Sequence, residues 1–145
     1  MRQATGILTI WTGGPGLIDI TGQLERWLAD KALDGPAIDG LVTLFCRHTS
    51  ASLTVQENAD PSVLLDLQTA MGGLAPHGGR ERYRHASEGP DDMAAHIRTV
   101  LSGVQLAIPL LEGRLSLGTW QGVYLWEHRD RGRDREVAVH ALAEP

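Results

Sequence analysis

Residues 41–54 read Leu-Val-Thr-Leu-Phe-Cys-Arg-His-Thr-Ser-Ala-Ser-Leu-Thr. The first six residues are apolar or β-branched, which is typical of a buried strand. A histidine and four hydroxyl side chains then follow within seven residues. Because such side chains add little to a hydrophobic core, we expect the strand to end near His48 and a polar site to open there.

The pattern outside this stretch predicts further strands interrupted by helices. We expect strands over residues 4–11, 38–47, 50–56, 104–111, 114–128 and 134–142. Thr21 is expected to cap a first helix, and further helices are expected to begin at Asp60-Pro61 and at Gly89-Pro90-Asp91-Asp92. Strands dominate without a regular strand–helix alternation. The predicted fold class is therefore α+β, a two-layer sandwich with a mixed, largely antiparallel β-sheet and about three helices, in a single domain over residues 1–145.

Apolar spacing also predicts which face of each helix is buried. The expected core residues are Leu24, Trp27, Leu28 and Ala32 in the first helix, Val63, Leu64, Leu67, Met71 and Leu74 in the second, and Met93, Ile97, Val100 and Leu101 in the third. A loop of about 16 residues, 75–90, is long enough to indicate function or mobility. Asp130-Arg131-Gly132 predicts a hairpin turn.

Composition limits the classes of partner and location. The net charge of −5 argues against a general affinity for nucleic acid or for anionic membranes. The single cysteine, Cys46, excludes an internal disulfide and is expected in the core. The chain has neither a signal-peptide pattern at its start nor an apolar stretch long enough to cross a bilayer. We therefore expect a cytoplasmic protein.

Three histidines occur in settings that suggest chemistry. His48 ends the apolar strand, His85 lies in the long loop, and His96 follows Asp92 by one turn of the expected third helix. At that spacing Asp92 can orient the His96 ring. Three neutral imidazoles match a catalytic site for zinc or another divalent ion, although no compact His-x-x-x-His spacing supports it. The alternative is that each ring is held by hydrogen bonds within the fold.

Several other polar residues have both a functional and a structural interpretation. Glu57 is a candidate general base or a ligand for a hard cation. Asp60 is equally well explained as a helix cap. Trp120 lies between two glycines in residues 118–122, a pattern that marks close approach of a ligand, but it also suits a core or subunit-interface anchor. An arginine from residues 129–135 can clamp a phosphate, or the run is a solvated turn.

Five motifs occur together in a fixed order: His48-Thr49-Ser50-Ala51-Ser52-Leu53, Glu57-Asn58-Ala59-Asp60-Pro61, Tyr83-Arg84-His85, Glu88-Gly89-Pro90-Asp91-Asp92-Met93-Ala94-Ala95-His96-Ile97 and Gly118-Thr119-Trp120-Gln121-Gly122. In this combination the chain resembles the YjbQ-like family, often labelled secondary thiamine-phosphate synthase. The resemblance runs from about residue 41 to the C-terminus. Ala94 stands where the family often has proline and Gln56 where it often has asparagine, and neither departure touches the histidines.

The resemblance implies a single-domain α/β sandwich that assembles as a homotrimer and gathers its shared polar residues in one pocket. It also implies a weak ability to join the pyrimidine diphosphate and thiazole phosphate halves of thiamine. Carried over to this sequence, the implied pocket residues are His48, Thr49, Ser50, Glu57, Asp60, His85, His96, Trp120 and Gln121.

We therefore expect an enzyme that acts on a small phosphorylated metabolite. The expected reacting residues are His48, Glu57 and His96, with a divalent metal (zinc or magnesium) on His48, His85 and His96, and the expected substrate-binding residues are Thr49, Ser50, Asp60, Trp120, Gln121 and Arg129. Against a dedicated diphosphate enzyme, the chain has no glycine-rich phosphate loop and no Asp-rich cation motif. The alternatives are a non-catalytic metal- or ligand-binding trimer and a metal-assisted hydrolase of another phosphate ester.

Overall fold

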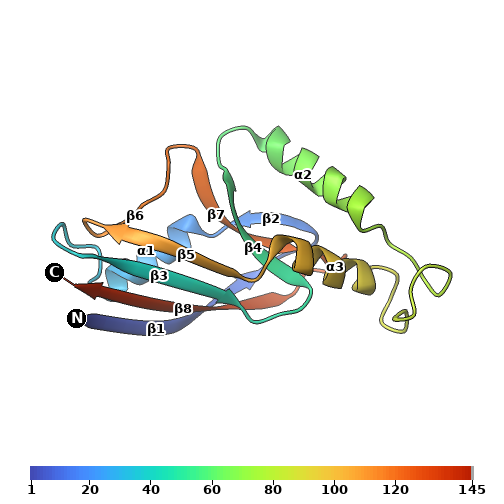
Figure 1. The fold of residues 1–145 in the computed structure, drawn as a ribbon, viewed down its shortest axis with the longest axis horizontal. Coiled ribbons are helices and arrows are strands. Elements are labelled where there is room, and N and C mark those ends of the chain that lie inside the picture. Colours follow the sequence, from blue (N-terminus) through green and yellow to red (C-terminus); the bar gives the residue numbers. More distant parts are fainter. Residues whose placement is uncertain (145) are drawn as a thin grey trace.

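The eight strands form two antiparallel sheets, as the computed structural model shows for residues 1–144 (Figure 1). The larger sheet has the order β1 (Arg2–Trp11), β8 (Asp134–Glu144), β3 (Asp39–Cys46), β5 (Gln105–Leu111) and β6 (Arg114–Leu115). The smaller sheet has the order β2 (Gly16–Asp19), β7 (Gln121–Glu127) and β4 (Ala51–Glu57). Together with three helices, these sheets confirm the predicted α+β class.

The three helices are α1 (Thr21–Asp30), α2 (Pro61–Leu74) and α3 (Asp92–Ser102). Asp60 caps α2 as predicted, because its carboxylate accepts a hydrogen bond from the Ser62 amide at 2.9 Å. Thr21 is not a cap. It is the first residue of α1, and its hydroxyl instead accepts a hydrogen bond from the Val123 amide in β7. Among residues 1–144, no helix combines the length and the hydropathy that a bilayer crossing requires.

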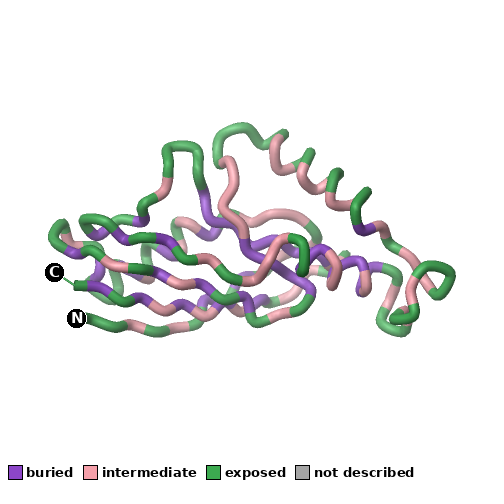
Figure 2. The backbone as a smooth tube through the Cα atoms, in the orientation of Figure 1, coloured by how far each residue is buried: buried purple, intermediate pink, exposed green. Residues whose placement is uncertain are grey.

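One hydrophobic core unites the two sheets and α1. Alternate side chains of the larger sheet point inward, as the burial pattern along β8 illustrates (Figure 2). The smaller sheet and the α1 face that carries Leu24 and Leu28 close the other side of this core. The largest apolar side chains that it buries almost completely are Ile20, Leu24, Leu28, Leu33, Leu44, Leu53, Leu110 and Leu125.

Within residues 1–144, no helix covers the outer face of the larger sheet. Its apolar side chains include Ile7 in β1, Leu41 and Phe45 in β3, Leu111 in β5 and Leu142 in β8, and each of them is exposed. An antiparallel sheet with one wet face normally alternates apolar with polar residues. This face therefore has a composition more typical of a contact surface than of a solvated one.

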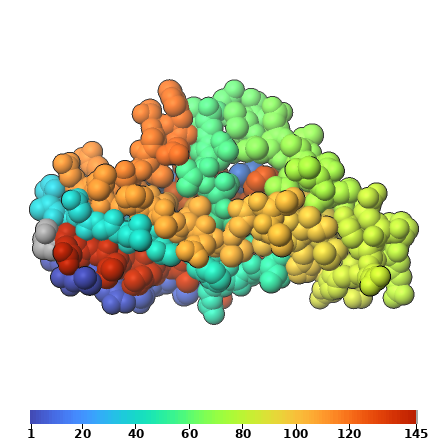
Figure 3. All heavy atoms as spheres, viewed as in Figure 1, coloured from blue at the N-terminus to red at the C-terminus, as the bar shows by residue number. Residues whose placement is uncertain are grey.

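The predicted face of α2 has the expected orientation, because Val63, Leu64, Leu67 and Met71 are half-buried, but it is not a core face, and the predicted buried face of α3 is wrong. No residue of α2 is buried, and Leu74 is 71% exposed. Figure 3 shows the surface hollowed between α2 and α3, so α2 is not packed closely on the core. In α3 the side chain of Val100 is 83% exposed, whereas Asp92 and Arg98 are buried. The helix is rotated away from the expected orientation because its two charged residues have polar partners inside.

The strand predictions are correct for β1, β3, β4, β5 and β8 to within a few residues, but the segment over 114–128 is divided. It forms β6 and β7, which belong to different sheets. The turn at Asp130-Arg131-Gly132 is not a hairpin, because it leads from β7 in the smaller sheet to β8 in the larger one. A Cβ atom on Gly132 would lie 2.5 Å from the Gly13 backbone, so this crossing requires glycine. The sequence pattern did not predict β2.

Candidate metal centre

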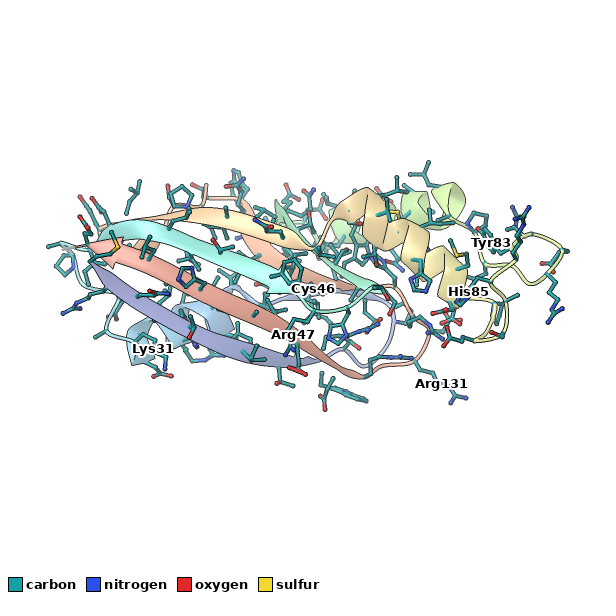
Figure 4. All side chains as sticks on the ribbon, turned by 60° about the horizontal axis from the view of Figure 1, so that its bottom comes forward. Lys31, Cys46, Arg47, Tyr83, His85 and Arg131 are labelled. Carbon is teal, nitrogen blue, oxygen red and sulfur yellow. The ribbon has the colours of Figure 1, made fainter. Side chains whose placement is uncertain are left out.

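The polar residues that the fold brings together lie at one end of both sheets. Here the chain leaves β3, passes through residues 47–50 and enters β4, while β7 crosses to β8 beside it. The segment over residues 75–91 and the first turn of α3 complete this end. Figure 4 shows Cys46 and Arg47 near the end of β3, with His85 on the loop beside α3.

Four side chains from the long loop and α3 form a group that can hold a metal ion. His85, Glu88, Asp92 and His96 each offer one ligand atom, and these atoms all lie within 4.8 Å of one another. The His85 Nε2 atom lies 2.6 Å from Asp92 Oδ2 and 3.1 Å from Glu88 Oε2. The His96 Nε2 atom lies 3.3 Å from the same Asp92 oxygen.

The hydrogen bond on the far side of the His96 ring determines what its Nε2 atom can do. Nδ1 lies 3.0 Å from the carbonyl oxygen of Thr49, which can only accept, so Nδ1 carries a proton. In the neutral ring Nε2 then presents a lone pair to the Asp92 carboxylate, which is also an acceptor. Two acceptors at 3.3 Å need a cation between them, either a proton on Nε2 or a metal ion. A histidine fixed by a backbone carbonyl in this way is the usual arrangement of a metal ligand.

Arg129 holds the acidic residues of this group in place. Its Nη1 donates to Asp92 at 2.6 Å, its Nε donates to Asp91 at 2.8 Å, and its Nη2 donates to the Glu88 carbonyl at 3.0 Å. Burial alone would raise the pKa of Asp92, but hydrogen bonds from His85 and the charge of Arg129 lower it overall. The carboxylate is therefore ionised and oriented before any ligand arrives.

His85 forms the exposed side of the same group, because its side chain is 44% exposed whereas that of Asp92 is 4% exposed. The hydrogen bond to Asp92 raises the pKa of His85, which favours its protonated form in the absence of metal. A metal ion would have to displace that proton. Metal binding at this centre is consequently a competition with protons.

A buried ion pair fixes the neighbouring loop. Glu127, the last residue of β7, accepts a hydrogen bond from Arg135 Nε in β8 at 2.7 Å, and both side chains are almost fully buried. The Thr12 hydroxyl and the Arg129 amide donate to the remaining lone pairs of the carboxylate. Arg135 also donates to the carbonyl and the hydroxyl oxygen of Ser50, at 3.1 and 3.0 Å. Both sheets are thereby joined to the loop that carries His48, Thr49 and Ser50.

His48 does not join the other two histidines, and the prediction that it shares a metal with them is not met. Its Nε2 atom accepts a hydrogen bond of 2.7 Å from the Glu136 amide, so the lone pair needed by a metal is already in use. Burial, followed by the charge of Arg135, lowers the pKa of His48, which keeps the ring neutral. The ring instead lines a cavity of about 810 Å³ together with Thr49, Ser50 and His96.

The remaining predicted site residues lie at the opposite end of the smaller sheet. Glu57 pairs with Gln121 at one end of β4 and β7, whereas Ala51 pairs with Glu127 at the other end. Six residues of strand separate the two ends by about 20 Å. Glu57 Oε2 accepts a hydrogen bond from the Asp60 amide, and Gln121 Oε1 accepts one from the Gly118 amide. Glu57, Asp60, Trp120 and Gln121 are thus not brought to the metal centre within one chain.

The sequence pattern does not predict a function for some residues at and beside the metal centre. Glu88 was assigned no role, and Asp92 was expected only to orient His96 rather than to bind metal. The spacing His85-x-x-Glu88 and Asp92-x-x-x-His96 is a signal for both, since residues three or four apart share a helix face or a tight turn. Glu127 and Arg135 carried no such signal, because their contact depends on two strands in different sheets.

We expect the substitution Glu127→Gln to lower the free energy of unfolding by about 3 kcal/mol or more, because it leaves the buried Arg135 guanidinium without its counter-charge. Glu136→Gln is the matched control. It removes an exposed partner of Arg47, and it should cost less than about 1 kcal/mol. Urea titrations of both variants measure the difference, and equal costs would contradict a structural role for the buried pair.

Stability should also depend on pH through His128. Its Nε2 atom lies 2.8 Å from the Ser52 hydroxyl, and burial, followed by the charge of Arg98, lowers its pKa to about 4. At pH values between the unfolded pKa of about 6.5 and this folded pKa, the unfolded chain binds a proton on His128 that the folded chain does not. The free energy of unfolding therefore falls as pH falls through this range. The loss from this residue is about 3 kcal/mol. In His128→Gln, the fall in unfolding free energy between pH 7 and pH 4 should be smaller by about that amount, and an unchanged profile would argue against it.

Comparison with known proteins places the chain in a family. The model of the family described as UPF0047 protein YjbQ-like matches residues 7–144. A UPF0047 protein of Synechocystis sp. is 50% identical over 143 residues, which cover 99% of this chain and 94% of the relative. The UPF0047 protein YjbQ of Escherichia coli O157:H7 is 39% identical over 131 residues, which cover 90% of this chain and 91% of the relative.

Solved structures agree with the family match. The crystal structure of a hypothetical protein from Aeropyrum pernix K1 has a TM-score of 0.85 at 32% identity. The match covers 97% of this chain and 99% of the Aeropyrum chain. The crystal structure of a conserved hypothetical protein from Thermus thermophilus has a TM-score of 0.80 at 42% identity, with coverages of 94% and 99%. These descriptions name no activity. The family model and these relatives together mean that the chain belongs to the UPF0047 (YjbQ-like) family.

Proposed function

We propose that this protein is a divalent-metal enzyme that acts on a small phosphorylated metabolite at the group formed by His85, Glu88, Asp92 and His96. The observation that carries the proposal is the placement of the His96 ring, whose Nδ1 atom lies 3.0 Å from the Thr49 carbonyl oxygen while its Nε2 atom lies 3.3 Å from the ionised Asp92 carboxylate. Hydrogen bonds from Arg129 keep that carboxylate in position without a metal. Such preorganisation is more useful to a binding site than to a solvated surface.

The donor set favours zinc over magnesium. Two imidazoles and two carboxylates match the nitrogen and oxygen ligands that zinc accepts, whereas magnesium prefers an all-oxygen shell. When bound, such an ion supplies positive charge to a phosphoryl oxygen or lowers the pKa of a bound water. Arg129 contributes by fixing Asp92, and His85 contributes by exchanging its proton for the ion.

Joining the pyrimidine diphosphate and thiazole phosphate halves of thiamine is the specific reaction that the family resemblance suggests. The need to neutralise a departing diphosphate is consistent with a cationic centre. Glu57 has no part in this proposal within one chain, because it lies at the far end of β4. A metal-assisted hydrolase of another phosphate ester would use the same four residues.

A non-catalytic metal site is the second candidate, and the ligand count favours it. Four protein ligands fill a tetrahedral zinc site, which is typical of structural sites, whereas catalytic sites keep a position open. The role of Glu88 distinguishes a structural zinc site from a catalytic one. The Glu88 side chain is 63% exposed and lies 3.1 Å from His85 at the exposed side of the group, so it is the ligand that a water or substrate can replace most easily.

We expect His96→Ala and Asp92→Asn each to lower zinc affinity at least tenfold, because both remove a well-held ligand. His77→Ala is the matched control, since this exposed histidine lies outside the group. Isothermal titration with Zn²⁺ and metal analysis of the purified protein measure the change. If all three variants bind zinc like the unsubstituted protein, the proposed centre is wrong.

Turnover of a panel of phosphorylated metabolites, including the two thiamine precursors, tests the enzymatic part. An enzyme should retain zinc in Glu88→Gln and lose turnover in His96→Ala. Zinc binding without turnover of any member by the unsubstituted protein would support the non-catalytic candidate.

The homotrimer and the cytoplasmic location that we expect also belong to this proposal. The uncovered face of the larger sheet, with Ile7, Leu41 and Leu142 exposed, is the surface best suited to contact other copies. Ile7→Arg should therefore dissociate the oligomer in sedimentation experiments. Leu65→Arg, on the exposed side of α2, is the control. Dissociation by Leu65→Arg alone would move the interface to α2.

A further inference from the structure

The cavity beside the metal centre has its own binding chemistry. It lies between the end of β3, residues 47–50 and the outer side of α3, and has a volume of about 810 Å³. Ligand sites for small molecules commonly enclose about 300–1,000 Å³. His96 belongs both to this cavity and to the metal centre, so a molecule in the cavity would lie next to the metal ligands.

We infer that this cavity binds a phosphate monoester with a small apolar group. The phosphate would contact the hydrogen-bond donors of residues 48–50, and the apolar group would contact Phe45, Val100 and Val104. This inference rests on the proposed function in one respect only: it assigns the cavity to the substrate of the same centre.

The fold uses the hydrogen-bond acceptors of residues 48–50 and leaves their donors free. Because His48 Nε2 accepts from the Glu136 amide, the neutral ring carries its proton on Nδ1, which has no acceptor among residues 1–144. The Ser50 hydroxyl oxygen accepts from Arg135, so its own hydrogen is available to another partner. The Thr49 hydroxyl makes no hydrogen bond to any of these residues either. The three residues that carry these donors all line the cavity.

The charges around the cavity also suit an anion. No aspartate or glutamate lines the cavity, although the whole chain has a net charge of −5. The carboxylates near the cavity each have a basic partner. Glu127 pairs with Arg135 and Glu136 with Arg47, while in the metal-binding group beside His96 Asp92 pairs with Arg129 and Glu88 with His85. An anion in the cavity therefore meets donors and guanidinium groups rather than unpaired negative charge.

Another part of the cavity lining is apolar and exposed. Val100 is 83% exposed and Phe45 is 47% exposed, and together with Val104 they line the same cavity. Exposed apolar side chains that converge on a concave surface are typical of a ligand site. An inorganic ion would leave this wall uncovered. An ester with an apolar group would cover it.

Phenyl phosphate is a suitable probe, with inorganic phosphate as the comparison. We expect the full-length protein, dialysed against a chelator, to bind phenyl phosphate at least tenfold more tightly than inorganic phosphate in isothermal titration. Val100→Asp places a carboxylate on the apolar wall at an exposed position, and it should weaken binding at least tenfold. Leu101→Asp is the matched control, because this neighbour in α3 is exposed but does not line the cavity.

His48→Gln tests the donor wall separately. The glutamine oxygen can accept from the Glu136 amide and preserve the loop, but the Nδ1 donor is lost. Binding should weaken about tenfold while the urea midpoint stays within error of that of the unsubstituted protein. If His48→Gln unfolds the loop, Val100→Asp and Leu101→Asp still give the test.

The results distinguish this inference from the proposed function. If phenyl phosphate binds equally to the unsubstituted protein and Val100→Asp, or does not bind, the subsite is wrong whatever the metal centre does. Binding that requires added zinc and is abolished by Asp92→Asn, but not by Val100→Asp, would place the phosphate on the metal and overturn the subsite alone. Loss of binding in Val100→Asp in a protein that takes up no zinc would support the subsite and overturn the proposed metal enzyme.

Discussion

The ion pair between Glu127 and Arg135 is the contact on which the polar end of the molecule depends. Both side chains are almost fully buried, and they belong to strands of different sheets. Removing two charges from water costs several kcal/mol per ion unless the geometry and the remaining hydrogen bonds compensate. Here compensation is nearly complete, since Thr12, Arg129 and Ser50 satisfy the other lone pairs and protons. The pair therefore fixes where the sheets meet rather than adding much stability.

The position of the metal centre follows from this junction. Glu127 holds the Arg129 amide, and the Arg129 side chain in turn holds Asp91 and Asp92. Arg135 holds Ser50, and the adjacent Thr49 carbonyl holds His96. Two ligands from one helix are thus oriented from two directions by groups that one buried pair has fixed.

The sequence predicted features that depend on local chemistry and not those that depend on distant strands. The Asp60 cap of α2 and the strand that ends before His48 are local, and both are present. The exposed Val100 shows why helix orientation was predicted wrongly: apolar spacing assumes that a helix buries its apolar face, whereas α3 buries Asp92 and Arg98. The convergence of His85 and His96 was foreseen. The use of His48 by the Glu136 amide was not, because no pattern in the sequence indicates which backbone donor will lie opposite a ring.

The lengths of β4 and β7 limit how the family motifs can act together. His48, His85 and His96 lie at one end of these strands, whereas Glu57 and Gln121 pair at the other, about 20 Å away. No side chain spans that distance, so one chain cannot gather all the motif residues around one ligand. If the motifs share a single pocket, a second chain has to supply part of it. In the proposed assembly such a chain docks on the uncovered apolar face of the larger sheet. Phe45 belongs both to that face and to the cavity beside His96. Assembly and site chemistry are therefore questions about the same surface.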